Sequence, residues 1–320
     1  MSLISELKNG LHFKSKRTSF WVGIVLALLA AIFASTTTVV GKALVDPSYG
    51  YVEDAIHPLN LAIFLGLTAG LFFTPLAKGK QSPTKFSKKS LFLVMMLGVT
   101  DVAAITTNFF GLQHTTSVNA TILLNTDLLF VLLIAIIVFK ERIQKRETFP
   151  LALVALGAII IPLGVVFAQN GTFVSGFVMG DMMILLAAGF FALDISIAKF
   201  VSMRVPASRI SQISAFAGIP FALVLMLIFQ VPFDIPWEQM PIIVYMGIFV
   251  SGLSYYFFIV ALRLIGAIRT ILTYSTSTAF GIFFSAIFLG EGISPLHIVS
   301  VIVIIVGIYL LRQKIASMEE

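Results

Sequence analysis

The sequence predicts an all-α integral membrane protein of ten transmembrane helices in two inverted five-helix repeats. Three observations predict this class: composition, regularly spaced apolar runs and an internal repeat. Of 320 residues, 58% are hydrophobic and 11% charged, and the mean hydropathy is +1.03. Soluble domains carry about 25% charged residues. We therefore expect lipid to solvate most of the chain.

The apolar runs are each roughly 18–25 residues long, enough for a helix to cross about 30 Å of hydrocarbon. Proline, glycine or charged residues separate them, as at Asp46-Pro47 and Gln169-Asn170-Gly171. The predicted spans are about 20–45, 58–77, 91–112, 117–139, 148–168, 177–201, 210–230, 241–262, 268–290 and 295–312.

The charges alternate between the predicted faces of the membrane. All but one of the 21 lysines and arginines fall on the face that holds both termini, and the exception is Lys42. The opposite loops carry mainly acids, such as Asp46, Asp234 and Glu291. The positive-inside rule then predicts cytoplasmic termini. The expected location is the cell membrane. Since the basic segments adjoin membrane spans, we expect no nucleic-acid binding, and the lipid bilayer is the expected partner.

The two halves of the chain repeat. Residues 113–161 align with 263–311 at an offset of 150, matching Glu141 with Glu291. At an offset of 157, Gly23-x4-LLAA-x10-Lys42 aligns with Gly180-x4-LLAA-x10-Lys199. Because five spans is an odd number, the second copy is expected to run in the opposite direction through the bilayer. Inverted repeats are typical of secondary transporters, although channels and membrane enzymes can also be duplicated.

The repeat defines the predicted domains. A basic cytoplasmic segment precedes two five-helix repeats, and a short cytoplasmic tail follows them. Their predicted bounds are 1–19, 20–168, 177–312 and 313–320. The sequence is compatible with a monomer.

Catalytic signatures are absent from the sequence. There is no Walker loop, HExxH, GxSxG or paired-histidine pattern, and no cysteine. We therefore expect neither an enzyme nor a cofactor or metal site.

Four stretches of sequence carry a family resemblance. They are Gly23–Ala43, Asn108–Gln144, Gly180–Phe200 and Tyr256–Ser294. In these stretches the chain resembles the drug/metabolite transporter superfamily, in particular its EamA-type exporters. The resemblance implies ten helices in two inverted repeats, and export or exchange of small metabolites by alternating access.

The chain departs from that family pattern at three places. Where many relatives have proline midway along the fourth and ninth helices, this chain has Asn125-Thr126-Asp127 and Ser275-Thr276-Ser277. An arginine often found in the second helix is also missing. These departures border the expected cavity, so no relative's substrate is carried over.

Three acids lie inside predicted spans, where charge is costly and usually faces the bundle interior or water. Asp101, Asp127 and Asp194 align with uncharged residues of the other half: Ser251, Ser277 and Thr37. Two hypotheses apply to each acid: it binds substrate or a proton, or it is a structural acid bonded to neighbouring helices. The candidate substrate-binding or coupling residues are these six together with Asn108, Asn125, Tyr255 and Tyr274.

Other polar residues have structural interpretations. Hydroxyls are dense over 270–278, which suits either helix packing or a wet surface. Lys42 either pairs with an acid, attracts anions at the mouth of the cavity, or extends to the interface. Glu291 is expected to cap or clamp a neighbouring loop, and Asp181 to be an interfacial or capping residue. Glycines over 66–70 and 247–252 are expected to permit close helix packing.

The sequence as a whole favours a secondary transporter that exports or exchanges a small polar or amphipathic metabolite such as an amino acid, with proton coupling as one option. A cavity between the two halves is expected to bind the substrate. The alternative is a non-transporting membrane protein: a channel, a scaffold or an intramembrane enzyme.

Overall fold

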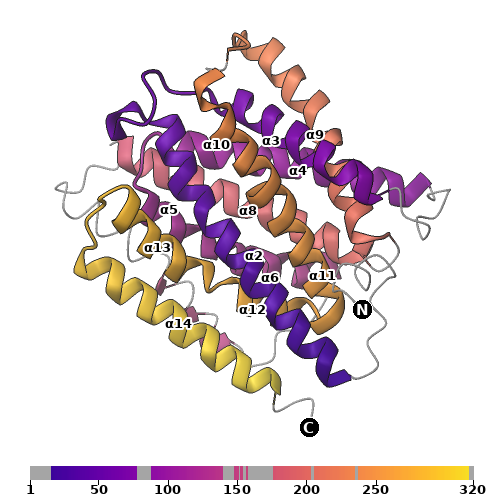
Figure 1. Cartoon of the computed structure of the whole chain (residues 1–320). Coiled ribbons are helices and arrows are strands. Elements are labelled where there is room, and N and C mark those ends of the chain that lie inside the picture. Colours follow the sequence, from indigo (N-terminus) through magenta and orange to yellow (C-terminus); the bar gives the residue numbers. More distant parts are fainter. Residues whose placement is uncertain are drawn as a thin grey trace. The chain divides into compact units, whose positions relative to one another are not determined.

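The fold is helical throughout the part of the chain that the structure describes. The structure is a computed structural model, and it describes residues 16–77, 88–139, 148–150, 152–153, 156–157, 176–202, 205–234 and 237–316. No strand occurs in these residues. The α-helices, shown in Figure 1, are α2 (Lys16–Val45), α3 (Pro58–Ala77), α4 (Lys88–Leu112), α5 (Ser117–Leu123), α6 (Asp127–Phe139), α8 (Gly176–Ser202), α9 (Ala207–Phe229), α10 (Met240–Tyr245), α11 (Tyr255–Ile265), α12 (Ala267–Tyr274), α13 (Ser277–Phe288) and α14 (Pro295–Ala316).

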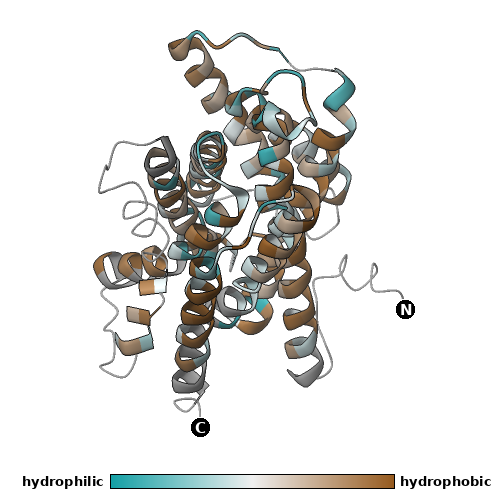
Figure 2. Ribbon diagram, turned by 90° about the vertical axis from the view of Figure 1, so that its left-hand side faces the viewer, coloured by the Kyte–Doolittle hydropathy of each residue, from teal (hydrophilic) through white to brown (hydrophobic). Residues whose placement is uncertain are grey.

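Within the described residues, six helical segments are long and apolar enough to cross a membrane. They are Ser19–Val45, Pro58–Ala77, Lys88–Leu112, Met179–Ser202, Ala207–Phe229 and Trp237–Ile265. Figure 2 shows hydrophobic residues predominating along the helices. Each segment overlaps a predicted span, and the predicted 58–77 coincides with α3. The predicted span 148–168 lies largely outside the described residues.

Two predicted spans are not continuous helices. The span 117–139 is broken by a 3₁₀ turn, Leu124–Thr126, between α5 and α6. The span 268–290 is broken by a turn between α12 and α13. Asn125 Nδ2 donates to the carbonyl of Thr121 at 3.1 Å, and Thr126 Oγ1 donates to that of Leu123 at 2.8 Å. Polar side chains that bond to the preceding turn compete with the backbone bonds of a helix and often bend it.

The second interruption has a similar local cause. Thr278 Oγ1 donates to the carbonyl of Ser275 at 3.0 Å, and the Thr278 amide bonds to the same carbonyl at 3.3 Å. These short-range bonds replace part of the α-helical pattern at the start of α13. The sequence departures at 125–127 and 275–277 therefore coincide with the two helix breaks.

The segment Trp237–Ile265 is helical but changes its winding. Between α10 and α11, residues Met246–Ser254 form a π-helix. Insertions of this kind are frequent at functional sites. The predicted close packing of its glycines is confirmed, because a Cβ at Gly252 would lie 3.1 Å from the Phe73 ring.

The Cα positions cluster into two compact units. Unit 1 contains 1–34, 59–102 and 197–274, and unit 2 contains 35–58, 103–196 and 275–320. The core of unit 1 includes Leu97 of α4, Ile210 of α9 and Ile259 of α11. In unit 2, Val118 and Ile122 of α5 pack with Ile304 of α14.

Glycines bring helix backbones together inside unit 1. A Cβ at Gly66 of α3 would lie 2.9 Å from the carbonyl oxygen of Ala215. On α4, a Cβ at Gly98 would lie 2.6 Å from the backbone nitrogen of Gly218. Small residues permit such backbone approach, which supplies packing energy where lipid supplies no hydrophobic drive. The glycines of α3 and α4 thus fix how closely α9 packs.

We expect Gly98→Ala to destabilise the protein by about 1–3 kcal/mol, because the added methyl group meets backbone atoms that cannot rotate away. Gly189→Ala on α8 is the control, since a Cβ there meets nothing within 4 Å. The control is expected to be neutral or to stabilise by up to about 1 kcal/mol. Unfolding midpoints in detergent measure both. Equal midpoints for the two variants would contradict the close approach of α4 and α9.

Candidate functional site

Unit 2 contains a buried network of uncharged side chains, here named the hydroxyl–amide network. Thr38 and Thr121 share a hydrogen bond of 2.8 Å between their Oγ1 atoms. Ser285 Oγ donates to Ser117 Oγ at 2.8 Å, and Asn125 Nδ2 donates to Thr278 Oγ1. The network consists of Thr38, Ser117, Thr121, Asn125, Thr278 and Ser285, all buried.

The network joins α2, α5 and α13. Helices α5 and α13 lie side by side (Figure 1). A Cβ at Gly281 would lie 2.5 Å from Thr121 Cγ2, so this glycine allows the two helices to approach at the level of the network. Hydrogen bonds between helices are favourable in a membrane because lipid offers no substitute partner. The network therefore places neutral hydrogen-bonding groups deep inside unit 2.

Six of the predicted site residues lie in unit 2. Asn125 belongs to the network, and Thr37 and Ser277 are the chain neighbours of network residues. Asp127 begins α6 immediately after the helix break and is partly exposed. Asp194 on α8 is buried.

Asn108 of α4, the sixth, has an unusual environment. It is fully buried, and neither its amide nitrogen nor its oxygen has a hydrogen-bond partner among the described residues. A buried amide without partners is unfavourable. Such a group is suited to bind a polar ligand or water.

Unit 1 contains the other four predicted residues: Asp101, Ser251, Tyr255 and Tyr274. All four are partly exposed. The Tyr274 ring meets Phe258 edge-on with centroids 5.0 Å apart, and Tyr255 packs on the core of unit 1. The predicted residues are therefore distributed over both units.

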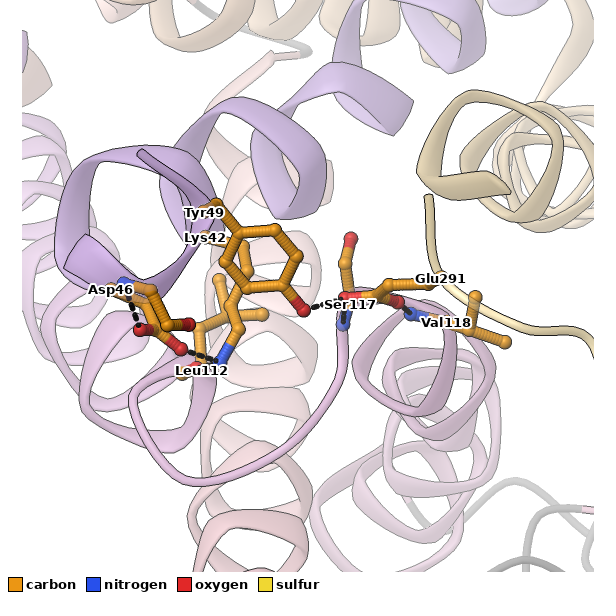
Figure 3. Close-up of polar contacts among 8 residues, drawn as sticks. Lys42, Asp46, Tyr49, Leu112, Ser117, Val118 and Glu291 are labelled. Atoms are coloured by element: carbon orange, nitrogen blue, oxygen red, sulfur yellow. Dashed lines mark hydrogen bonds and ion pairs between the residues drawn. The ribbon is translucent and has the colours of Figure 1, made fainter. Parts of the chain in front are cut away.

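A second polar group lies beside the network, here named the Glu291 cluster: Lys42, Asp46, Tyr49 and Glu291 (Figure 3). Glu291 Oε1 accepts the Ser117 amide at 2.8 Å, and Oε2 accepts the Val118 amide at 2.8 Å. A carboxylate is favourable there because the first amides of a helix have no partner within it. The predicted capping role of Glu291 is confirmed.

Tyr49 connects Glu291 to the segment after α2. Its hydroxyl donates to Glu291 Oε1 at 2.9 Å. Burial raises the pKa of Tyr49, and the hydrogen bond to Glu291 and that residue's charge raise it further. Tyr49 therefore remains a neutral donor throughout the physiological pH range.

Lys42 is buried and paired. Its Nζ lies 2.7 Å from Asp46 Oδ2 and donates to the carbonyl of Leu112 at 2.5 Å. The ammonium also lies 5.6 Å from the centroid of the Tyr49 ring. The predicted pairing of Lys42 with an acid is confirmed.

We expect Asp46→Asn to destabilise the protein by about 2 kcal/mol near pH 7, because Lys42 keeps a buried charge without its counter-ion. Burial alone would raise the pKa of Asp46, but hydrogen bonds from Lys42 and Ser48 and the charge of Lys42 hold it below 3.8. A lowered pKa stabilises the fold above the unfolded pKa, and that contribution is lost as pH falls through the folded value. The difference between wild type and variant is therefore expected to be constant above about pH 5 and to shrink below about pH 4.

Unfolding midpoints measured against pH test this expectation. Asp54→Asn is the control, because Asp54 is an exposed acid in the same connection between α2 and α3. A variant difference that persists unchanged below pH 4 would contradict the ion pair as its source.

Asp181 was expected at an interface or a helix cap, and the structure corrects this. It is 1% exposed and lies inside α8, which begins at Gly176. Its Oδ1 accepts a hydrogen bond from Thr115 Oγ1 at 2.5 Å. Sequence reasoning missed this contact because Thr115 lies 66 residues away along the chain.

The membrane-length apolar helices define an integral multi-pass membrane protein. The family model described as the EamA-like transporter family matches residues 21–163 and 178–313. The chain belongs to the EamA-like transporter family. The starts of the matched segments are 157 residues apart and their ends 150, the two offsets at which the halves align.

Relatives in three organisms are described as uncharacterized transporters. One, from Methanothermobacter thermautotrophicus, is 27% identical over 90% of this chain and 85% of its own length. Another, from Bacillus subtilis, is 25% identical over 90% of this chain and 86% of its own length. A third is from Clostridium kluyveri, 24% identical over 89% of this chain and 91% of its own.

A solved structure described only as "Crystal structure of protein" has a similar fold. It covers 96% of this chain and 100% of its own, with a TM-score of 0.66 and 15% identity. This similarity supports the helical fold and carries no information on substrate.

Proposed function

We propose that this protein is a secondary transporter that exports or exchanges a small polar or amphipathic metabolite by alternating access. The observation that carries the proposal is the interruption of two helices at corresponding positions. The breaks at Leu124–Thr126 and Ser275–Thr276 differ by the 150-residue repeat offset. Paired discontinuous helices form the substrate sites of many secondary transporters.

The proposal includes ten membrane helices in two inverted repeats. It is supported by two matched family segments and by the repeat of Glu141 and Glu291 at corresponding positions. Because each half has an odd number of helices, the two interrupted helices run through the bilayer in opposite directions. Local rearrangement at each break then opens the site alternately to the two sides of the membrane.

The chemistry of the network favours a small solute with several hydrogen-bonding groups, such as an amino acid. Asn125 is both a network residue and the cause of the first helix break. Asn108 offers an amide donor and acceptor without protein partners among the described residues. Neutral amides and hydroxyls bind a polar solute without holding it as tightly as a full charge would, which suits release on the far side.

The proposed topology places both termini in the cytoplasm, as the lysine and arginine asymmetry favours, and the proposed location is the cell membrane. Because the chain has no cysteine, the labelling of a single introduced cysteine reports the topology without labelling of native thiols. In intact cells, an impermeant thiol reagent is expected to label Asp54→Cys and Glu238→Cys but not Lys88→Cys.

The decisive experiment uses purified protein in liposomes. The vesicles are screened with labelled amino acids, nucleosides and organic ions for counterflow. Saturable exchange of one class is expected, with no ionic conductance in planar bilayers. Folded protein that exchanges none of these classes, or that conducts ions at channel rates, would contradict the proposal.

A further inference from the structure

We propose that Asp181 is the proton-binding carboxylate that couples transport to a pH gradient. This inference rests on the proposed function and names its energy source. Asp181 was not among the acids that the sequence singled out for this role.

The first observation is a buried carboxylate with one unused oxygen. Asp181 is 1% exposed; its Oδ1 accepts a hydrogen bond from the Thr115 hydroxyl at 2.5 Å, and the Asn119 side chain is a second hydrogen-bonding neighbour of the carboxyl group. Oδ2 is buried and has no hydrogen-bond partner among the described residues. Burying a carboxylate with so few partners is costly, and binding a proton at Oδ2 removes the charge.

The second observation is a chain of hydrogen bonds that leads to Asp181 from α14. The ring of His297 accepts the Ser294 amide at Nδ1, 3.1 Å away. The neutral ring therefore carries its hydrogen on Nε2 and donates to Asn119 Oδ1 at 2.8 Å. Asn119 Nδ2 donates to Thr115 Oγ1 at 3.4 Å. The Thr115 hydroxyl then has its hydrogen available for Asp181.

The direction of this chain determines where a proton binds. Each donor points toward Asp181, so Oδ1 is an acceptor. In a reversed chain the ring hydrogen of His297 would be on Nδ1, where it would clash with the hydrogen of the Ser294 amide. The Ser294 amide thus fixes the polarity through His297, which acts as a positioning residue. The free lone pairs of Oδ2 are the remaining place for an incoming proton.

The other ionisable groups around Asp181 belong to four elements. His114 lies in the turn after α4, whose backbone packs on Gly180, and Glu291 binds the first amides of α5. His297 lies on α14, and Lys42 of α2 reaches the end of α4 but is paired with Asp46. Among these groups, His297 is the one that the chain of hydrogen bonds joins to Asp181, through Asn119 and Thr115.

The site suits a proton better than a metal cation. Metal ions such as Ca²⁺ and Mg²⁺ require about six oxygen ligands. Asp181 offers one unused oxygen, and the described residues contain no group of three or more His, Cys, Asp or Glu arranged to hold a metal. In the proposed cycle Asp181 takes a proton at Oδ2 from one side and releases it to the other, becoming neutral and then anionic.

Proteoliposomes loaded with the exchanged solute test the proposal. For Asp181→Asn, accumulation driven by an imposed pH gradient is expected to fall to the level seen without a gradient, while solute exchange continues. Asp54→Asn, an exposed acid, is the control and is expected to match wild type. Gradient-driven accumulation by Asp181→Asn would overturn the proposal, as would loss of both activities in a folded variant.

A second variant preserves the test if Asp181→Asn does not fold. Thr115→Val removes the hydroxyl that donates to Oδ1 of the carboxylate, which favours the neutral acid. The pH of half-maximal gradient-driven uptake is expected to move upward by up to about one unit. An unchanged profile would overturn the proposal. His297→Phe is expected to move the same midpoint, whereas a purely structural role of His297 would leave it in place.

A substrate-free measurement separates this proposal from the proposed function. Infrared difference spectra of the purified protein are expected to show a protonated-carboxyl band that grows as pH falls and is missing in Asp181→Asn. This band without any flux would contradict transport and leave the proton site standing. A wild-type protein without the band would overturn the proton site whatever its flux.

Discussion

Glu291→Ala is expected to destabilise the protein by about 2–4 kcal/mol, the equivalent of one or two hydrogen bonds to a charged group. The carboxylate accepts the amides of Ser117 and Val118 and the hydroxyl of Tyr49. Alanine leaves these three donors without their acceptor at the start of α5. Glu291→Gln is expected to lose about half as much, because its amide retains one accepting oxygen.

Unfolding in detergent measures the loss, and hydrogen exchange locates it. Faster exchange is expected at Ser117 and Val118, the two amides that Glu291 binds. Glu53→Ala removes an exposed acid between α2 and α3 and serves as the control. Alanine and glutamine variants as stable as wild type would contradict the clamp.

The spans were predictable because a membrane helix is specified by local information. Twenty apolar residues between polar breaks define α3 without reference to the rest of the chain. The capping role of Glu291 also followed from its place at a helix end. The span depends on residues that lie close together in the sequence, whereas the amides that Glu291 caps lie 173 and 174 residues away and could not be named from the sequence.

The features that the sequence did not predict depend on distant partners or on competition between hydrogen bonds. Asp181 is buried beside Thr115, a residue of another segment whose hydroxyl donates a hydrogen bond to it. Asn125 and Thr126 were recognised as unusual, but hydropathy averages over them and predicted one continuous helix. Their side chains interrupt that helix only because they compete with its backbone bonds.

The helix break itself leads to the largest functional effect that we expect. Replacing Asn125 with leucine and Thr126 with alanine removes both side chains that bond to the preceding turn. Residues 117–139 are then expected to form one α-helix, since leucine and alanine favour it. The substitution of Asn125 also removes its hydrogen bond to Thr278. We expect exchange to fall at least about tenfold, the effect of losing one hydrogen bond of about 1.4 kcal/mol with the substrate or in the moving element.

The matched control is Thr100→Ala on α4. Thr100 also bonds to its preceding turn, at 3.0 Å to the Met96 carbonyl and 3.1 Å to that of Leu97, but its helix is continuous. Exchange by this variant is expected to equal wild type, while the double variant retains its unfolding midpoint or gains stability. An element that rearranges during transport cannot be made rigid without slowing the cycle. Exchange at the wild-type rate by the double variant would therefore contradict a role of the helix break in transport.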